Sequence, residues 1–164
     1  MALPNKVLPG FSAALYCQPT SSPTPLTTSA LSTVASVAAI AVSGNLLPVE
    51  AIPAFGQDDA VASFAIAGSR QSDKIPVQAA PTSMTITAAW NPADSQLLLM
   101  REDAKSGVID RTFVISATDG TNIVYYAFNG RVGEFKIDSA PGAEAKCIFS
   151  VHPRGNQYGW SNNA

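Results

Sequence analysis

The period of the apolar residues changes at Trp90, and this change constrains the fold more than any other feature of the sequence. Up to that point one face of a strand would carry Met84, Ile86, Ala88 and Trp90. Beyond it, Ala93, Leu97, Met100 and Ala104 recur at the spacing of an amphipathic helix. The sequence therefore predicts a strand with one buried face that leads directly into a single helix over about residues 92–106.

The predicted helix has signals at both ends. Asn91 can cap its first turn, and Pro92 suits the first helical position because its fixed φ is already helical. Gly107 can close the helix in a left-handed conformation. These signals set the expected bounds of the helix.

Strand patterns return after the helix and are separated by turn signals. The expected strands cover residues 111–117, 121–128, 131–138 and 145–151. Asp119-Gly120 and Asn129-Gly130 stand between them and favour the positive φ angles of tight hairpin turns, and Ala140-Pro141-Gly142 provides a third turn. This part of the chain is predicted to be a four-stranded antiparallel meander, followed by an irregular C-terminal tail over residues 152–164.

The first half of the chain gives weaker patterns. Residues 11–17 alternate as a strand, with Leu15 and Cys17 on the inward face, and the Pro-rich residues 18–28 indicate a connection. Residues 33–42, 45–52 and 60–67 are further strand candidates, rich in small apolar residues. Residues 53–81 form a long loop or hairpin between prolines.

These elements predict one domain over residues 1–164, with residues 1–10 as an N-terminal arm. The expected class is mainly β, an antiparallel β-sandwich or barrel-like domain with one flanking helix and a long central loop. Trp90, Phe113 and Phe149 are expected in the core, and Cys17 and Cys147 as small buried residues.

Charged residues make up only 13% of the chain, with a formal net charge of −2. No strongly basic surface for nucleic acid is expected, and sparse charge favours a surface that meets other protein. The longest weakly polar run, residues 30–42, is shorter than the ~20 residues that a membrane-spanning helix needs. We expect a soluble product without a membrane partner.

No catalytic or cofactor motif is found in the sequence. His152 is the only histidine, and a nucleophile needs a base beside it. One histidine and two distant cysteines give no metal-ligand spacing. We expect no enzyme activity, no cofactor and no metal site.

Loop aromatics and the charges of the long central loop are the candidate contact residues. The aromatic candidates pack on their own domain or anchor an interface, and the charged ones dock on a neighbour or lie on a solvated hairpin tip. The candidate subunit-interface residues are Phe55, Asp58, Asp59, Arg70, Asp73, Lys74, Tyr158 and Trp160.

The layout resembles the major tail tube proteins of long-tailed, flexible-tailed bacteriophages. Residues 84–100, in which a Thr-rich strand ends in Trp90 and runs into the helix, carry most of this resemblance. Residues 111–122 and 125–132 are similar to the family's strand, turn and strand. The resemblance covers about residues 46–151, and the Pro/Ser/Thr/Ala-rich residues 18–43 depart from the family pattern.

The resemblance implies a structural virion subunit assembled in the host cytoplasm. Six copies would form a ring, and rings would stack into a hollow tail tube, similar to the type VI secretion tube, through which viral DNA passes without specific binding. The implied partners are further copies of the chain and other tail proteins, such as the tape measure, terminator and distal tail proteins. The alternative is a monomeric, non-catalytic β-sandwich binding module, for example one that binds carbohydrate.

Overall fold

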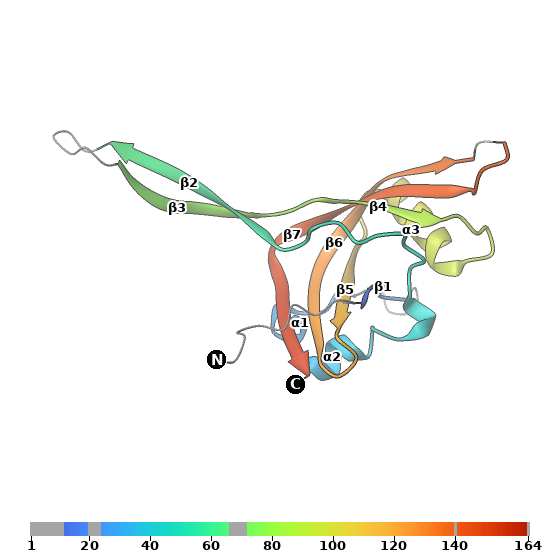
Figure 1. Ribbon diagram of the computed structural model, residues 1–164, viewed down its shortest axis with the longest axis horizontal. Coiled ribbons are helices and arrows are strands. Elements are labelled where there is room, and N and C mark those ends of the chain that lie inside the picture. Colours follow the sequence, from blue (N-terminus) through green and yellow to red (C-terminus); the bar gives the residue numbers. More distant parts are fainter. Residues whose placement is uncertain (1–11, 20–23, 66–71, 140, 164) are drawn as a thin grey trace, which may run out of the picture.

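The computed structural model describes residues 12–19, 24–65, 72–139 and 141–163. Its centre is a curled antiparallel sheet with strand order β1-β5-β6-β7-β4 (Figure 1). The strands are β1 (Ser12–Cys17), β4 (Met84–Ala89), β5 (Asp110–Thr118), β6 (Ile123–Asp138) and β7 (Lys146–Asn163). The mainly β class with one substantial helix is therefore confirmed.

The inner face of the sheet holds the main core. Leu15, Phe113, Phe128 and Phe149 lie on this face and are at most 1% exposed. The helix α3 (Ser95–Ser106) packs here through Leu97, Met100 and Ala104 of the predicted stripe, whereas Ala93 lies before the helix and is exposed. Burial of large side chains at roughly 25 cal/mol per Å² makes this face the main source of stability.

The N-terminus of α3 differs from the prediction. The helix is capped by Asp94, whose carboxylate accepts hydrogen bonds from the Gln96 and Leu97 amides at 2.8 and 3.3 Å. Asn91 instead accepts from the Ala93 amide at 3.0 Å and forms a turn before the helix. Asp94 is the better N-cap because its negative charge interacts favourably with the positive end of the helix dipole. Gly107 closes the helix at φ 67°, as expected.

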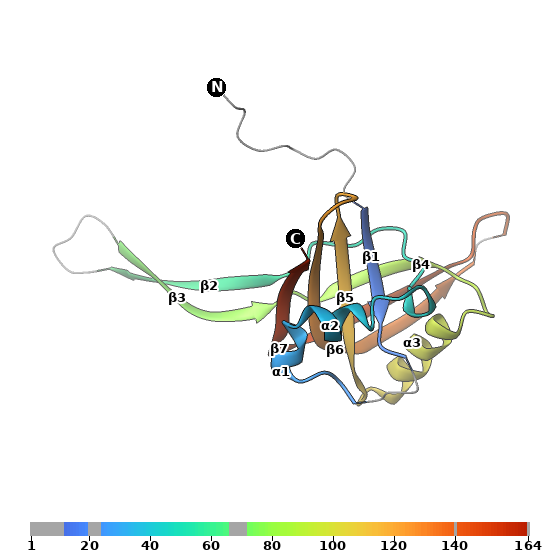
Figure 2. The same ribbon diagram turned by 90° about the horizontal axis from the view of Figure 1, so that it is seen from below.

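The outer face of the sheet is covered by residues 24–47, which we call the strap. The strap contains α1 (Thr28–Leu31), α2 (Val34–Ala38) and the 3-10 turn η1 (Ser43–Asn45), and Figure 2 shows its helices across the sheet. Leu31, Val37 and Ile40 pack on Val114 and Ala127 of the sheet. Strands predicted at 33–42 and 45–52 are therefore wrong: helical turns take the first segment, and the second makes only isolated bridges to β1 and β4.

β6 and β7 are longer than the sequence predicted. Asn129-Gly130 does not turn the chain; β6 runs through it, and the register with β7 shifts between Phe128 and Gly130 and again between Val132 and Phe135. Residues 152–163, predicted as an irregular tail, pair with β6 as part of β7. The meander accordingly has three strands, and its Asp119-Gly120 turn is confirmed with Gly120 at φ 93°.

The segment 53–81 becomes a two-stranded antiparallel ribbon. β2 (Gln57–Ala65) pairs with β3 (Ser72–Pro81), and the ribbon projects far from the sheet (Figures 1 and 2). The strand candidate at 60–67 falls within β2 up to Ala65. No helix in the described part of the chain is long and apolar enough to cross a membrane.

Candidate assembly interface

An aromatic cluster brings three of the predicted contact residues together. Phe55 stacks on Tyr126 with ring centroids 5.4 Å apart, and Trp160 lies 4.6 Å from Tyr126 and 6.0 Å from Phe55. Tyr158 lies 6.1 Å from Tyr126 and donates its hydroxyl hydrogen to the Gln57 side-chain oxygen at the root of the ribbon. Phe55 and Tyr158 therefore pack on their own domain, and an interface role for these aromatics stays a prediction.

Trp160 is the exposed member of the aromatic cluster. It remains 52% exposed although its ring contacts Tyr126. A half-exposed indole wastes apolar area in a solvated monomer, whereas such residues are enriched in the buried centres of interfaces. Trp160 is therefore a candidate anchor for a second protein surface.

The backbone beside Trp160 also has an open side. β4 pairs with β7 only as far as Val151, and among the described residues no strand pairs with the outer edge of β7 beyond it. β3 contacts β7 near the root of the ribbon without pairing. An unpaired strand edge offers amide and carbonyl groups to another chain.

The predicted charged residues are distributed along the ribbon. Asp58 and Asp59 lie near its root, opposite Ala80 and Ala79, whereas Asp73 and Lys74 lie toward its far end. Arg70 lies outside the described residues.

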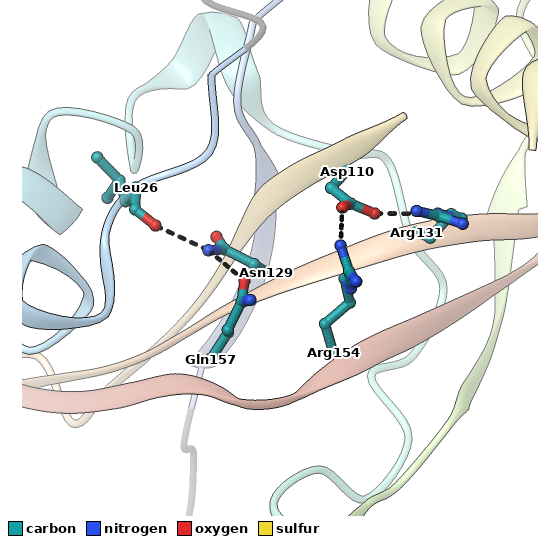
Figure 3. Close-up of polar contacts among 6 residues, drawn as sticks. All are labelled: Leu26, Asp110, Asn129, Arg131, Arg154 and Gln157. Atoms are coloured by element: carbon teal, nitrogen blue, oxygen red, sulfur yellow. Dashed lines mark hydrogen bonds and ion pairs between the residues drawn. The ribbon is translucent and has the colours of Figure 1, made fainter. Parts of the chain in front are cut away.

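A buried polar network holds the strap to the sheet (Figure 3). The Asn129 side-chain amide donates to the Leu26 carbonyl oxygen at 2.7 Å and to Gln157 at 3.2 Å. The Thr112 hydroxyl donates to the Asn129 side-chain oxygen at 2.7 Å and accepts from the Leu26 amide at 2.9 Å. Asn129 is 2% exposed, so its polar atoms depend on these partners.

Beside this network, Arg131 and Arg154 share the carboxylate of Asp110 (Figure 3). We call these three residues the arginine cluster. Arg131 donates to one oxygen of Asp110 at 3.0 Å, and Arg154 donates to the other. Partial burial works to raise the pKa of Asp110, but the hydrogen bonds from both guanidinium groups hold it below its ordinary value. The ionised carboxylate of Asp110 therefore holds two partly exposed guanidinium groups close together.

A second ion pair is buried between α3 and the sheet. Arg111 binds Asp103 through two nitrogens, one of them 3.0 Å from its carboxylate oxygen, and both side chains are nearly inaccessible. This pair was not predicted from the sequence. On the helix surface, Arg101 pairs with Glu102 at 2.9 Å.

The residues considered for chemistry lie apart from the aromatic cluster, on the described strands β1 and β7. His152 is exposed, and its ring nitrogens lie 3.2 Å from the Ser150 hydroxyl and 3.0 Å from that of Ser83. Cys17 and Cys147 are buried free thiols, and burial raises the pKa of both. The described residues contain no group of three or more metal-ligating side chains of His, Cys, Asp and Glu.

Two features of this surface were not predicted from the sequence: the open edge of β7 and the arginine cluster. The edge was hidden because Pro153 and two glycines suggested an irregular tail. The cluster joins three strands, so no local spacing identifies it. The one available signal was adjacent Asp110 and Arg111 at a strand start, which must point to opposite faces.

Comparisons with solved structures reveal the same fold in phage tail assemblies. The chain is similar to a chain of the six-fold symmetrised anti-feeding prophage baseplate, with a TM-score of 0.63 and 9% identity over 100% of this chain and 98% of that one. It is also similar to the SPP1 tail tube protein, with a TM-score of 0.54 and 11% identity over 90% and 76% of the two chains. No protein-family model and no curated protein matches the sequence. The resemblance to tail tube proteins is thus confirmed at the level of the fold.

Proposed function

We propose that this chain is a non-catalytic structural subunit of a phage-type tail, which forms hexameric rings that stack into a hollow tube. The observation that carries the proposal is the likeness to a chain of the anti-feeding prophage baseplate over 100% of this chain and 98% of that one. In this role the chain belongs to the virion tail, is assembled in the host cytoplasm, and contacts its own copies and other tail proteins.

The open edge of β7 supports this proposal. In a ring, the sheet of one copy would continue into the next, so that the edge would be paired rather than left to aggregate. Trp160 lies on the same strand and would be buried at the new contact. In the monomer the strand edge is unpaired and the indole is half-exposed, and a closed assembly would cover both.

Size-exclusion chromatography and negative-stain microscopy of the purified chain test the proposal. We expect rings or tubes at high protein concentration. Trp160→Ser should remain folded but shift the protein to monomers, because it removes a candidate interface anchor. Val108→Ser is the matched control, since Val108 is 71% exposed in the loop after α3 and should tolerate the change.

A compact monomer under every salt and concentration condition would contradict assembly. If that monomer binds oligosaccharides and loses binding with Trp160→Ser, the carbohydrate-binding alternative is supported instead.

We further propose that viral DNA passes through the tube without specific binding. The chain carries ten basic and twelve acidic residues, so attractive phosphate contacts are few on average. Assembled tubes should retain duplex DNA weakly in filter binding even at low ionic strength. Tight, steeply salt-dependent retention of DNA would contradict the proposal that DNA passes through the tube without binding.

A further inference from the structure

The arginine cluster has one positive charge in excess. Each guanidinium group uses one nitrogen to bind Asp110, and the side chains of Arg131 and Arg154 are 38% and 51% exposed. A guanidinium carries five N–H donors, so most donors of this pair are left for another acceptor. Because both arginines are held by the same carboxylate, they form a preorganised site for an anionic group.

The far end of the β6–β7 pair shows the opposite balance. There Lys146 donates to Glu50 at 2.6 Å, and Asp138 lies opposite Lys146 in the strand register. The hydrogen bond to Glu50, with the nearby charges of Glu144 and Asp138, raises the pKa of Lys146. We call Glu50, Asp138, Glu144 and Lys146 the acidic tip. Glu50 pairs with the one ammonium group, so the carboxylates of Asp138 and Glu144 leave two negative charges in excess.

The two charge clusters cannot meet within one copy. Arg131 and Asp138 lie on the same strand, β6, seven residues apart, which at about 3.3 Å per residue separates them by about 23 Å. β6 is paired with β7 on both sides of this span, so the strand cannot fold back on itself. Neither cluster can therefore be neutralised by the other inside a subunit.

We propose that the acidic tip of one copy docks on the arginine cluster of the next copy. This inference rests on the proposed function and specifies one of its contacts. The two surfaces are different, so the contact is head-to-tail and repeats from copy to copy, which closes a ring or propagates a stack. In this contact, the carboxylates of Asp138 and Glu144 accept hydrogen bonds from the N–H donors of Arg131 and Arg154 that Asp110 leaves unused.

Complementary charge reversals test this contact in the full-length chain. Arg154→Glu reverses the excess charge of the arginine cluster, and the double variant Asp138→Lys with Glu144→Lys reverses that of the acidic tip. Each should raise the concentration needed for assembly about tenfold, because like charges then face each other. Mixing the two variants should restore assembly, since each reversed surface meets its opposite in the other variant.

Arg101→Glu is the matched control for Arg154→Glu. It makes the same change in charge at another half-exposed arginine, on the helix surface, and should leave assembly unchanged. Circular dichroism melts should confirm that all variants fold. Wild-type assembly should weaken between low and high salt, because an exposed contact is screened over about 8 Å at physiological ionic strength.

The outcomes separate this contact from the proposed function. If the wild-type chain never assembles, both are overturned. If it assembles and neither reversal matters, or if mixing fails to restore assembly of folded variants, only this contact is overturned. If Arg154→Glu leaves assembly intact but removes retention of duplex DNA, the arginine cluster is a phosphate site and the docking contact is wrong.

Discussion

The two faces of the central sheet are held by different kinds of interaction. On the inner face, large apolar side chains pack together, and α3 covers them. The rings of Phe113 and Phe128, for example, stack with their centroids 5.5 Å apart. On the outer face, the strap consists mainly of small residues and is fixed by the Asn129 network and by a close approach to Gly159. The inner face is stabilised chiefly by apolar volume, whereas the outer face depends on polar geometry and fit.

This difference explains why the sequence reveals one face and conceals the other. Large apolar residues at a regular period identify a buried face wherever they occur. A strap of Ala, Ser, Thr and Val has no such period. Its position depends on a side chain about a hundred positions away, because Asn129 donates a hydrogen bond to the carbonyl oxygen of Leu26 in the strap. The contrast also predicts how each face should respond to substitution.

The largest effect is expected on the inner face. Phe128→Ala should lower the free energy of unfolding by about 3 to 5 kcal/mol, because a fully buried ring leaves a cavity among Phe113, Tyr126 and their neighbours. Urea denaturation measures the loss. Ile137→Ala is the control, since Ile137 is 48% exposed near the end of β6 and should cost little. Equal losses in both variants would contradict the assigned core.

A smaller effect is expected where the strap touches the sheet. A Cβ atom at Gly159 would lie 2.6 Å from the Leu31 carbonyl carbon and 2.5 Å from the Ser32 hydroxyl oxygen, so Gly159→Ala must displace α1. We expect a loss of about 1 to 2 kcal/mol, within the usual cost of overpacking. Hydrogen exchange should rise over residues 31–41 while β5 and α3 stay protected.

Gly44→Ala is the matched control for this experiment. No atom lies within 4 Å of the Cβ position at Gly44, although this glycine also belongs to the strap. Its substitution should leave exchange in the strap unchanged. Loss of protection in the inner core with Gly159→Ala would show that the two faces do not respond separately.

The smallest effect concerns the acid stability of the arginine cluster. Because the folded pKa of Asp110 is held below its ordinary value of 3.8, its ion pairs stabilise the fold above that pH. This contribution, below about 1 kcal/mol for such exposed partners, is lost as pH falls below 3.8. Asp110→Asn should therefore be slightly less stable than wild type at pH 6, and the gap should close toward pH 2. A constant gap across this range would contradict the assigned pairing.

Several elements could be predicted because their signals are local. The strand at Met84–Ala89, the helix around Leu97 and the turn at Asp119-Gly120 each carry a period or a turn dipeptide of their own. Trp90 was expected in the core and is half-buried, with its ring 5.7 Å from Phe135.

Other elements depend on partners that no local window contains. Asn129-Gly130 favours a tight turn, but β5 and β7 lie on either side of β6 at this point and extend it through the dipeptide. Residues 152–163 look irregular, yet β6 pairs with them on both sides of the register shift between Phe128 and Gly130. In the candidate interface, the aromatic residues were identified by type, whereas the arginine cluster exists only because three strands bring Asp110, Arg131 and Arg154 together.

The hydrogen bond between Leu26 and Asn129 also sets an order of events during synthesis. The strap leaves the ribosome 103 residues before the side chain that fixes it. At about 5 to 20 residues per second, the strap waits roughly 5 to 20 s for its binding surface. Its low content of large apolar residues keeps that interval safe from premature association. The outer face is therefore completed only after β6 has been made.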